Sequence, residues 1–150
     1  MEQNEKYGKL IFQPHDLRCR QGESGVVEVW VPTRGVWLQL TPEEEVRRRV
    51  VRHLTERLRV PPTHIIEEYP IRLNGQPQRA DIVAVDYELK PWLVVECKAP
   101  DVALSQSVVD QVVRYNSVLG ARCVVVTNGR ALEAYAITEE GVYKRCDFPF

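Results

Sequence analysis

The feature that most constrains the fold is a short segment that is apolar on both faces and ends in two opposite charges. Its sequence is Trp92-Leu93-Val94-Val95-Glu96-Cys97-Lys98. The side chains of a β-strand alternate between two faces, and a strand that is apolar on both needs cover on both sides. The segment therefore predicts the central strand of an α/β sheet that is packed between helices.

A helix is expected to begin at Thr41-Pro42-Glu43-Glu44. Thr41 suits the N-cap, Pro42 suits the first helical position, and Glu44 completes a capping box. An apolar stripe at helical spacing follows, and Pro61-Pro62 limits the helix because proline cannot continue it. The stripe consists of Val46, Val50, Val51, Leu54 and Leu58.

The remaining core segments alternate with turn signals. Residues 65–73 and a return strand containing residues 80–85 flank Asn74-Gly75, the preferred pair for a tight hairpin turn. A second helix is expected over about 105–119, followed by a strand at 122–127. The order helix, three strands, helix, strand predicts a mixed α/β sheet with one crossover.

The chain is expected to form one domain over residues 1–150. Its parts are a β-rich N-terminal extension at 1–40, the core at 41–137 and a C-terminal tail at 138–150. Strand-like segments at 26–31 and 36–40 predict a hairpin within the extension. Segments at 133–137 and 141–144 predict a final edge pair.

Charge and hydropathy narrow the classes of function. The net charge is −1, from 20 Lys and Arg against 21 Asp and Glu, whereas proteins that hold DNA unaided carry a basic surplus because phosphate neutralisation drives affinity. A domain of this composition that acts on DNA is expected to rely on a partner subunit or a homodimer. No apolar run approaches the roughly 20 residues that span a bilayer. The polar start at residues 1–6 is unlike a signal peptide, so a cytoplasmic protein without membrane contact is expected.

Cysteine and histidine patterns do not predict a zinc site or nucleophilic catalysis. The cysteines are scattered, without a CxxC pair, and are expected to be reduced and buried. They are Cys19, Cys97, Cys123 and Cys146. The histidines lack the spacing of metal ligands and are expected to be structural or exposed; they are His15, His53 and His64. No GxSxG elbow of a serine hydrolase is present.

Two carboxylates and a lysine carry the candidate chemistry. On a strand, Glu96 and Lys98 point to the same face, and pairing with the preceding strand can bring Asp81 beside Glu96. Adjacent carboxylates repel unless a cation lies between them, and oxygen ligands suit Mg²⁺. A nearby lysine can orient water and stabilise developing phosphate charge. The structural alternatives are a Glu96–Lys98 pair that seals the sheet edge and an Asp81 pair with Arg79 or Lys98.

Both helices contribute further candidates. Gln111 and Tyr115 lie on the same face of the second helix as the apolar residues 104, 108 and 118. They reach either the acidic pair or a phosphate, or they are a satisfied core amide and an ordinary core tyrosine. Glu43 falls on the stripe that faces the sheet, whereas Glu44 falls away from it, so Glu43 is the expected outer metal or water ligand. Its alternative role is to complement the helix dipole.

Together these motifs resemble the PD-(D/E)xK nuclease superfamily. Asp81, Glu96-x-Lys98 and Gln111-x-x-x-Tyr115 match its acidic pair, its lysine and the QxxxY motif of its RecB-like branch. The surrounding sequence resembles the N-terminal nuclease domain of type I restriction enzyme R subunits over about residues 36–137. The matching stretches are Leu40-Thr41-Pro42-Glu43-Glu44-x-Val46-Arg47, Arg79-Ala80-Asp81-Ile82-Val83, Val94–Pro100, Asp110-Gln111-x-x-Arg114-Tyr115-Asn116 and Val126-Thr127-Asn128-Gly129.

The resemblance implies a restriction-endonuclease-like core with a mixed four-stranded sheet, and Mg²⁺-dependent cleavage of DNA in which Mn²⁺ substitutes for Mg²⁺. It implies that Asp81 and Glu96 hold the metal and that Lys98 positions the attacking water. Ala80 stands where the nominal motif has proline. No Walker-type GxxxxGK[ST] sequence occurs, so this chain is not expected to translocate along DNA.

A second interpretation is a non-catalytic module that keeps the nuclease fold and binds DNA or protein. Val109 and Val113 lie opposite the face of Gln111 and Tyr115, which makes the second helix apolar on both sides. The N-terminal hairpin is the expected cover for them, and a dimer or partner surface is the alternative.

Overall fold

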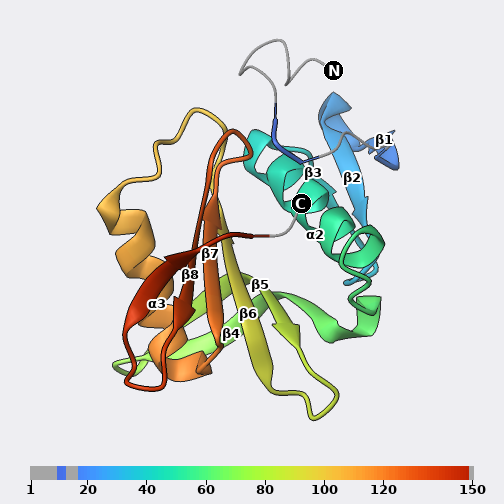
Figure 1. The fold of residues 1–150 in the computed structure, drawn as a ribbon. Coiled ribbons are helices and arrows are strands. Elements are labelled where there is room, and N and C mark those ends of the chain that lie inside the picture. Colours follow the sequence, from blue (N-terminus) through green and yellow to red (C-terminus); the bar gives the residue numbers. More distant parts are fainter. Residues whose placement is uncertain (1–9, 13–16, 149–150) are drawn as a thin grey trace.

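The computed structural model of the chain describes residues 10–12 and 17–148 (Figure 1). The first helix, α2 (Pro42–Glu56), begins where the sequence predicts it: Thr41 is the N-cap, and its Oγ1 accepts a hydrogen bond from the Glu44 N–H at 3.1 Å. The capping box is only half formed, because the Glu44 carboxylate pairs with arginines of the same helix while the Thr41 N–H donates to the Gln39 carbonyl. The predicted apolar stripe is confirmed for Val46, Val50, Val51 and Leu54, which are buried. Leu58, predicted to continue the stripe, lies beyond the end of α2 and is partly buried.

A mixed sheet of six strands forms the centre of the fold, in the order β4-β5-β6-β7-β8-β9. Its strands are β4 (Ile65–Leu73), β5 (Gln76–Val85), β6 (Pro91–Cys97), β7 (Cys123–Thr127), β8 (Leu132–Ile137) and β9 (Tyr143–Cys146). β6 and β7 are parallel and joined through α3 (Gln106–Leu119), and the other neighbours are antiparallel. The sheet has six strands rather than the expected four, because the predicted final edge pair is present as β8 and β9 and continues the sheet beyond β7. β9 also lies in the expected C-terminal tail.

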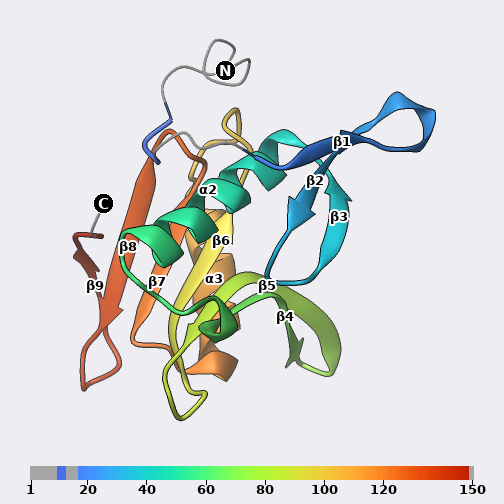
Figure 2. The same ribbon diagram turned by 90° about the vertical axis from the view of Figure 1, so that its right-hand side faces the viewer.

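The two faces of this sheet are covered by different helices. Figures 1 and 2 show α2 on one face and α3 on the other. Along β6, Leu93, Val95 and Cys97 pack in the core that contains α2, whereas Val94 packs in the core that contains α3. This alternation confirms the central strand covered on both sides, which the sequence predicts.

The surroundings of α3 differ from expectation. The helix ends at Gly120, whose φ of 68° lies in the left-handed region that favours glycine, as predicted. Val109 and Val113 are not covered by the N-terminal hairpin. They pack in the core that also contains Ile71 of β4, because α3 lies across the β4 side of the sheet. Val118, expected on the apolar stripe, is exposed.

β4 and β5 form the predicted hairpin around Asn74-Gly75, whose φ values of 49° and 76° suit a tight turn. Within β4 the pairing is interrupted at Glu68, which has a φ of 51° and no partner on β5, while Glu67 and Tyr69 on either side are paired. The register does not shift there: Glu67 pairs with Ile82 and Tyr69 with Ala80, so no residue is inserted and Glu68 lies opposite Asp81. Glu68 thus departs locally from extended backbone at the point where β4 passes Asp81 of β5.

The N-terminal extension contains the predicted hairpin and one further strand. The strands are β1 (Cys19–Gln21), β2 (Val27–Val31) and β3 (Val36–Gln39), which form a separate antiparallel sheet beside α2 (Figure 2). Val29 and Val31 are fully buried. Trp30 and Trp37 are cross-strand neighbours whose ring centroids lie 5.4 Å apart, and the Arg18 guanidinium lies 5.3 and 5.4 Å from the two centroids. Such aromatic and cation–π contacts stabilise a small sheet by about 0.5–1 kcal/mol each.

Among the described residues, no helix combines the length and the apolar character that crossing a membrane requires. The cysteines within this part of the chain are free thiols: Cys97 is buried, Cys123 and Cys146 are half-buried, and Cys19 is exposed. The exposure of Cys19 contradicts the expectation of buried thiols. His53 packs against the Phe12 and Phe148 rings and His64 against the Tyr87 ring, whereas His15 lies outside the described residues.

Candidate functional site

The two candidate carboxylates meet where β5 and β6 separate. The last paired residues are Ile82 and Val95, and the next positions on the two strands are Asp81 and Glu96. Asp81 Oδ2 accepts a hydrogen bond from the Cys97 backbone N–H at 2.8 Å. The side chain of Asp81 thus takes the place of a backbone contact, which fixes its carboxylate beside Glu96.

Glu96 is held in an environment that opposes its negative charge. Its side chain is 6% exposed, and burial followed by the negative charge of Asp81 raises its pKa from 4.5 to about 8, against the lowering effect of Lys98. Its Oε2 is buried without a hydrogen-bond partner among the described residues. A buried carboxylate of this kind needs a proton or a cation, because an unpaired buried charge is costly.

The raised pKa of Glu96 predicts a pH dependence of stability in the metal-free protein. Because the pKa in the folded state is about 8 and the ordinary value is 4.5, Glu96 contributes stability that is fully present below the ordinary pKa and is lost as the pH rises through 8. The substitution Glu96→Gln removes this titration. Urea unfolding in EDTA from pH 5 to pH 9 is expected to show wild type losing stability relative to Glu96→Gln. Parallel curves for the two proteins would contradict the assignment.

Lys98 follows β6 and remains close to Glu96. Its Nζ lies 3.7 Å from Glu96 Oε1, and its backbone N–H donates to the Thr127 carbonyl at 2.9 Å, which extends the pairing with β7. The ion pair expected from the structural alternative is present. It also places the ammonium group next to the acidic pair, as the sequence motif predicts.

Sequence reasoning missed the main partner of Asp81. Arg47 of α2 reaches it, with Nη2 3.1 Å from Asp81 Oδ1. The alternative that pairs Asp81 with Arg79 or Lys98 is therefore wrong, since Arg79 pairs with Glu68 and Lys98 pairs with Glu96. The available signal was a run of three arginines, 47–49, within a helix that also carries an apolar stripe, because arginines so close to a buried face need acidic partners.

The acids at the start of α2 have exchanged their expected environments. Glu44, expected to point away from the sheet, is buried and pairs with Arg47 at 3.0 Å and Arg48 at 2.8 Å. Glu43 has a side chain that is 43% exposed, with Oε1 3.6 Å from Arg47 Nη2. Partial burial and the charge of Asp81 raise the pKa of Glu43, while Arg47 and Lys98 lower it. Glu43 therefore lies in the same electrostatic surroundings as Asp81. It forms an ion pair with Arg47, whereas Glu44 pairs with both Arg47 and Arg48.

Gln111 and Tyr115 are brought to each other but not to the acidic pair. The Gln111 side-chain amide donates to the Tyr115 hydroxyl at 2.8 Å, and Tyr115 is buried in the core beneath α3. No hydrogen bond or ion pair within the described part of the chain joins either side chain to Asp81, Glu96 or Lys98. Their internal hydrogen bond gives the partly buried Gln111 amide a partner, as the structural alternative expects.

The oxygen atoms of Asp81 and Glu96 are suitable ligands for a divalent cation, although they do not form a closed site. Within residues 10–12 and 17–148, no three or more His, Cys, Asp or Glu side chains form a ready-made metal site, so Asp81, Glu96 and Glu43 are not gathered into a closed triad. The carboxylate oxygens are nevertheless the donors that Mg²⁺ prefers, and Glu96 Oε2 has no hydrogen-bond partner in the part of the chain that the structure describes. The residues fit a cation bound by Asp81 and Glu96 if Arg47 Nη2 gives up Asp81 Oδ1.

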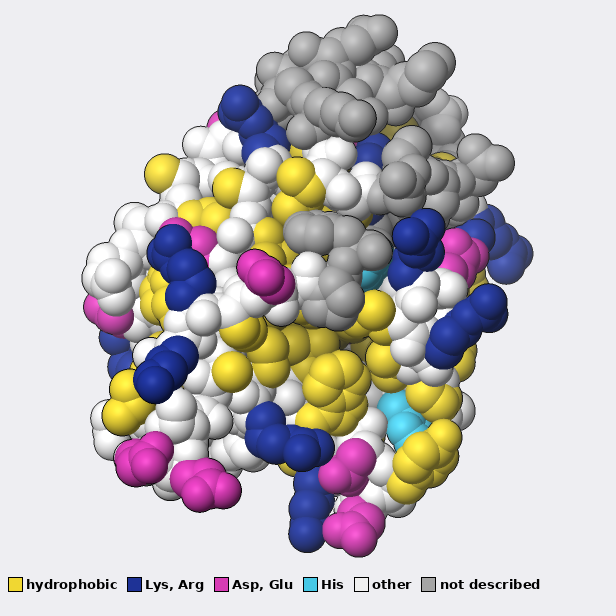
Figure 3. Space-filling view, in the orientation of Figure 1, with side chains coloured by type: hydrophobic (Ala, Val, Ile, Leu, Met, Phe, Trp, Pro, Cys, Tyr) yellow, Lys and Arg dark blue, Asp and Glu magenta, His cyan; other side chains and the backbone are white. Residues whose placement is uncertain are grey.

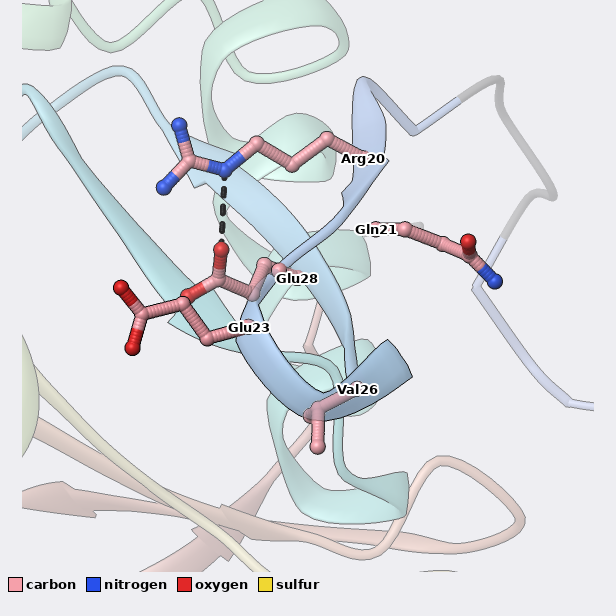
Figure 4. A pocket seen from close by; sticks show the side chains of 6 residues that line it. Arg20, Gln21, Glu23, Val26 and Glu28 are labelled. Carbon is pink, nitrogen blue, oxygen red and sulfur yellow. Dashed lines mark hydrogen bonds and ion pairs between the residues drawn. The ribbon is translucent and has the colours of Figure 1, made fainter.

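Two hollows of the described surface lie away from the acidic pair. One of about 670 Å³ lies in the loop between β1 and β2, where Arg20 points toward Glu28 (Figure 4). Another of about 440 Å³ is lined by residues of β8 and β9 together with Ile11 and Phe148. Figure 3 shows hydrophobic side chains gathered near the middle of the face drawn in Figure 1. Neither hollow is lined by Asp81, Glu96 or Lys98.

The fold and these side chains define a class of protein: a mixed α/β domain with an acidic pair and a lysine where two central strands part. The sequence model of the type I restriction enzyme R protein N terminus matches residues 42–147. The chain belongs to this family, and membership is consistent with a nuclease-related role. The match runs from the start of α2 through β9 and leaves the three-stranded sheet outside it. No curated protein matches the chain.

Proposed function

We propose that this chain is a Mg²⁺-dependent endonuclease that hydrolyses DNA phosphodiester bonds, with a PD-(D/E)xK core of the restriction-endonuclease-like type in a single domain of residues 1–150. One observation carries the proposal: the Asp81 carboxylate is fixed beside the buried Glu96 where β5 and β6 part, with Lys98 next to them. Membership in a restriction enzyme family supports the same reaction.

The roles of the residues follow from their positions. Asp81 and Glu96 hold the cation, with Glu43 as an outer ligand or a ligand to water. Bound Mg²⁺ supplies positive charge that stabilises the phosphate in the transition state and favours ionisation of water. The Lys98 ammonium positions the attacking water and stabilises the developing charge. Mn²⁺, which accepts the same oxygen donors, is expected to substitute.

Gln111 and Tyr115 are assigned to binding of a phosphate at the edge of the site. Gln111 is only partly buried, so its amide can exchange the Tyr115 hydroxyl for a phosphate oxygen. The net charge of −1 supports reliance on a partner subunit or a homodimer for much of the DNA affinity. We place this activity in the cytoplasm.

A non-catalytic module that binds DNA or protein is the second candidate. It is favoured by the ion pairs that already occupy the acids, Lys98 with Glu96 and Arg47 with Asp81. In that case the charged groups stabilise the edge of the sheet and no metal is required.

Metal binding and cleavage by wild type and Asp81→Asn distinguish the two candidates. This substitution retains a side-chain oxygen for the Cys97 N–H but removes the charge that binds the cation. Wild type is expected to be stabilised by millimolar Mg²⁺ or Mn²⁺ in thermal unfolding and to cleave supercoiled, linear or single-stranded DNA. Asp81→Asn is expected to lose both properties, and Asp101→Asn, which changes an exposed acid, is expected to lose neither. Absence of both metal stabilisation and cleavage in wild type would favour the non-catalytic module.

A further inference from the structure

We propose that Arg47 is a positioning residue that acts as a resident counter-cation of the site. In the metal-free protein it neutralises Asp81 and Glu43, and it turns the same nitrogen to a DNA phosphate once a divalent cation takes Asp81. The inference rests on the proposed function, because it concerns how that site binds its cation and its substrate.

The two terminal nitrogens of Arg47 face different sets of acids. Nη1 lies 3.0 Å from Glu44 Oε2 and 3.4 Å from Glu68 Oε1. Nη2 lies 3.1 Å from Asp81 Oδ1 and 3.6 Å from Glu43 Oε1. One nitrogen is thus held by acids outside the proposed set of ligands, and the other contacts two members of that set. Release of Nη2 leaves the guanidinium attached through Nη1.

Glu68, one of the two acids that contact Arg47 Nη1, has an unfavourable backbone conformation opposite Asp81. A φ of 51° is uncommon for a residue other than glycine, and strain of this kind costs on the order of 1–3 kcal/mol and is frequent near functional sites. One oxygen of the Glu68 carboxylate lies 3.4 Å from Arg47 Nη1, and the other lies 3.0 Å from Arg79 and 4.0 Å from Arg34. The anchor of Nη1 is therefore itself held by surface arginines.

The position of Arg47 Nη2 affects the binding of metal and the binding of DNA in opposite directions. A divalent cation on Asp81 is repelled by the neighbouring guanidinium, so Arg47 weakens binding of the metal alone. Arg47 stays beside the site with a side chain only 8% exposed, and a guanidinium released from a carboxylate is well suited to bind phosphate oxygens. Arg47 therefore strengthens binding of DNA in the presence of the metal.

The test compares wild type with Arg47→Met, which keeps the length and apolar character of the side chain but removes the charge. Isothermal titration with Mn²⁺ is expected to show about tenfold tighter binding by Arg47→Met. Fluorescence anisotropy with a DNA duplex in Mn²⁺ is expected to show about tenfold weaker binding, with Lys98→Ala present in both proteins to prevent cleavage. A purely structural role for Arg47 would weaken both interactions.

Glu68→Gln keeps the test decisive if Arg47→Met does not fold. The Glu68 carboxylate is partly exposed. Loss of its charge leaves Arg47 more firmly on Asp81, so Mn²⁺ binding is expected to weaken about threefold. Unchanged or weaker Mn²⁺ binding by folded Arg47→Met, or unchanged binding by Glu68→Gln, would overturn the role of Arg47 alone. Absence of Mn²⁺ binding by wild type and both variants would overturn the proposed function as well.

Discussion

Replacing Lys98 with alanine is expected to lower the rate of metal-dependent DNA cleavage by at least about 100-fold, the size of effect that follows loss of a charged group in the transition state. Lys98 is not among the proposed ligands, and its ammonium lies 3.7 Å from Glu96 Oε1. The substitution therefore removes a positive charge beside the acids without removing an oxygen donor. Affinity for Mn²⁺ is expected to stay the same or to rise slightly.

Single-turnover cleavage of supercoiled DNA, together with Mn²⁺ titration, separates these two effects. Lys90→Ala is a matched control, because Lys90 belongs to an exposed ion pair with Glu88 in the turn before β6. That variant is expected to cleave at the wild-type rate. Equal cleavage by wild type and Lys98→Ala would remove Lys98 from the reaction, and loss of Mn²⁺ binding would show that it shapes the metal site instead.

The largest effect on stability is expected for Glu67→Ala, which should lower the free energy of unfolding by about 3–5 kcal/mol. Glu67 of β4 forms an ion pair with Arg48 of α2, and the two side chains are 1% and 3% exposed. The Thr33 hydroxyl, in the turn between β2 and β3, also donates to Glu67. Removal of the carboxylate leaves a buried guanidinium with less compensation and cuts the link between α2, β4 and the three-stranded sheet.

Urea unfolding monitored by circular dichroism measures this loss. The matched control is Glu56→Ala, which removes an acid paired with Arg52 on the exposed side of the same helix. Surface pairs of this type contribute about 0.3–0.5 kcal/mol. If both variants lost similar amounts of stability, the Arg48–Glu67 pair would not be the buried link that its surroundings indicate.

Much of the fold follows from patterns that lie within a few residues of one another. Thr41 and Pro42 specify the start of α2, Asn74-Gly75 specifies the hairpin turn, and Gly120 specifies the end of α3. The apolar run before Glu96 predicts a strand covered on both sides, and β6 is such a strand. These predictions succeed because caps, turns and periodicity depend on local geometry.

The contacts of the candidate site also fall into those that local sequence patterns predict and those that they do not. Glu96 and Lys98 are two residues apart on one strand, so their proximity follows from the sequence alone. The position of Asp81 beside Glu96 depends on the antiparallel pairing of β5 with β6, which the order of strands and turns in the sequence predicts. The contact of Arg47 with Asp81 did not follow from a local pattern, because the run of arginines at 47–49 signals a need for acidic partners without showing that one of them lies on β5.

The sequence by itself determined the α/β class, the start of α2, the end of α3, and the pairing of Glu96 with Lys98. Only the tertiary structure decided that the predicted edge pair, β8 and β9, joins the central sheet at β7, that Val109 and Val113 are covered by the β4 side of the sheet, and that Glu44 is buried. The physical reason is distance along the chain: local patterns select the elements, but contacts between distant elements depend on which arrangement buries their apolar faces and pairs their charges together.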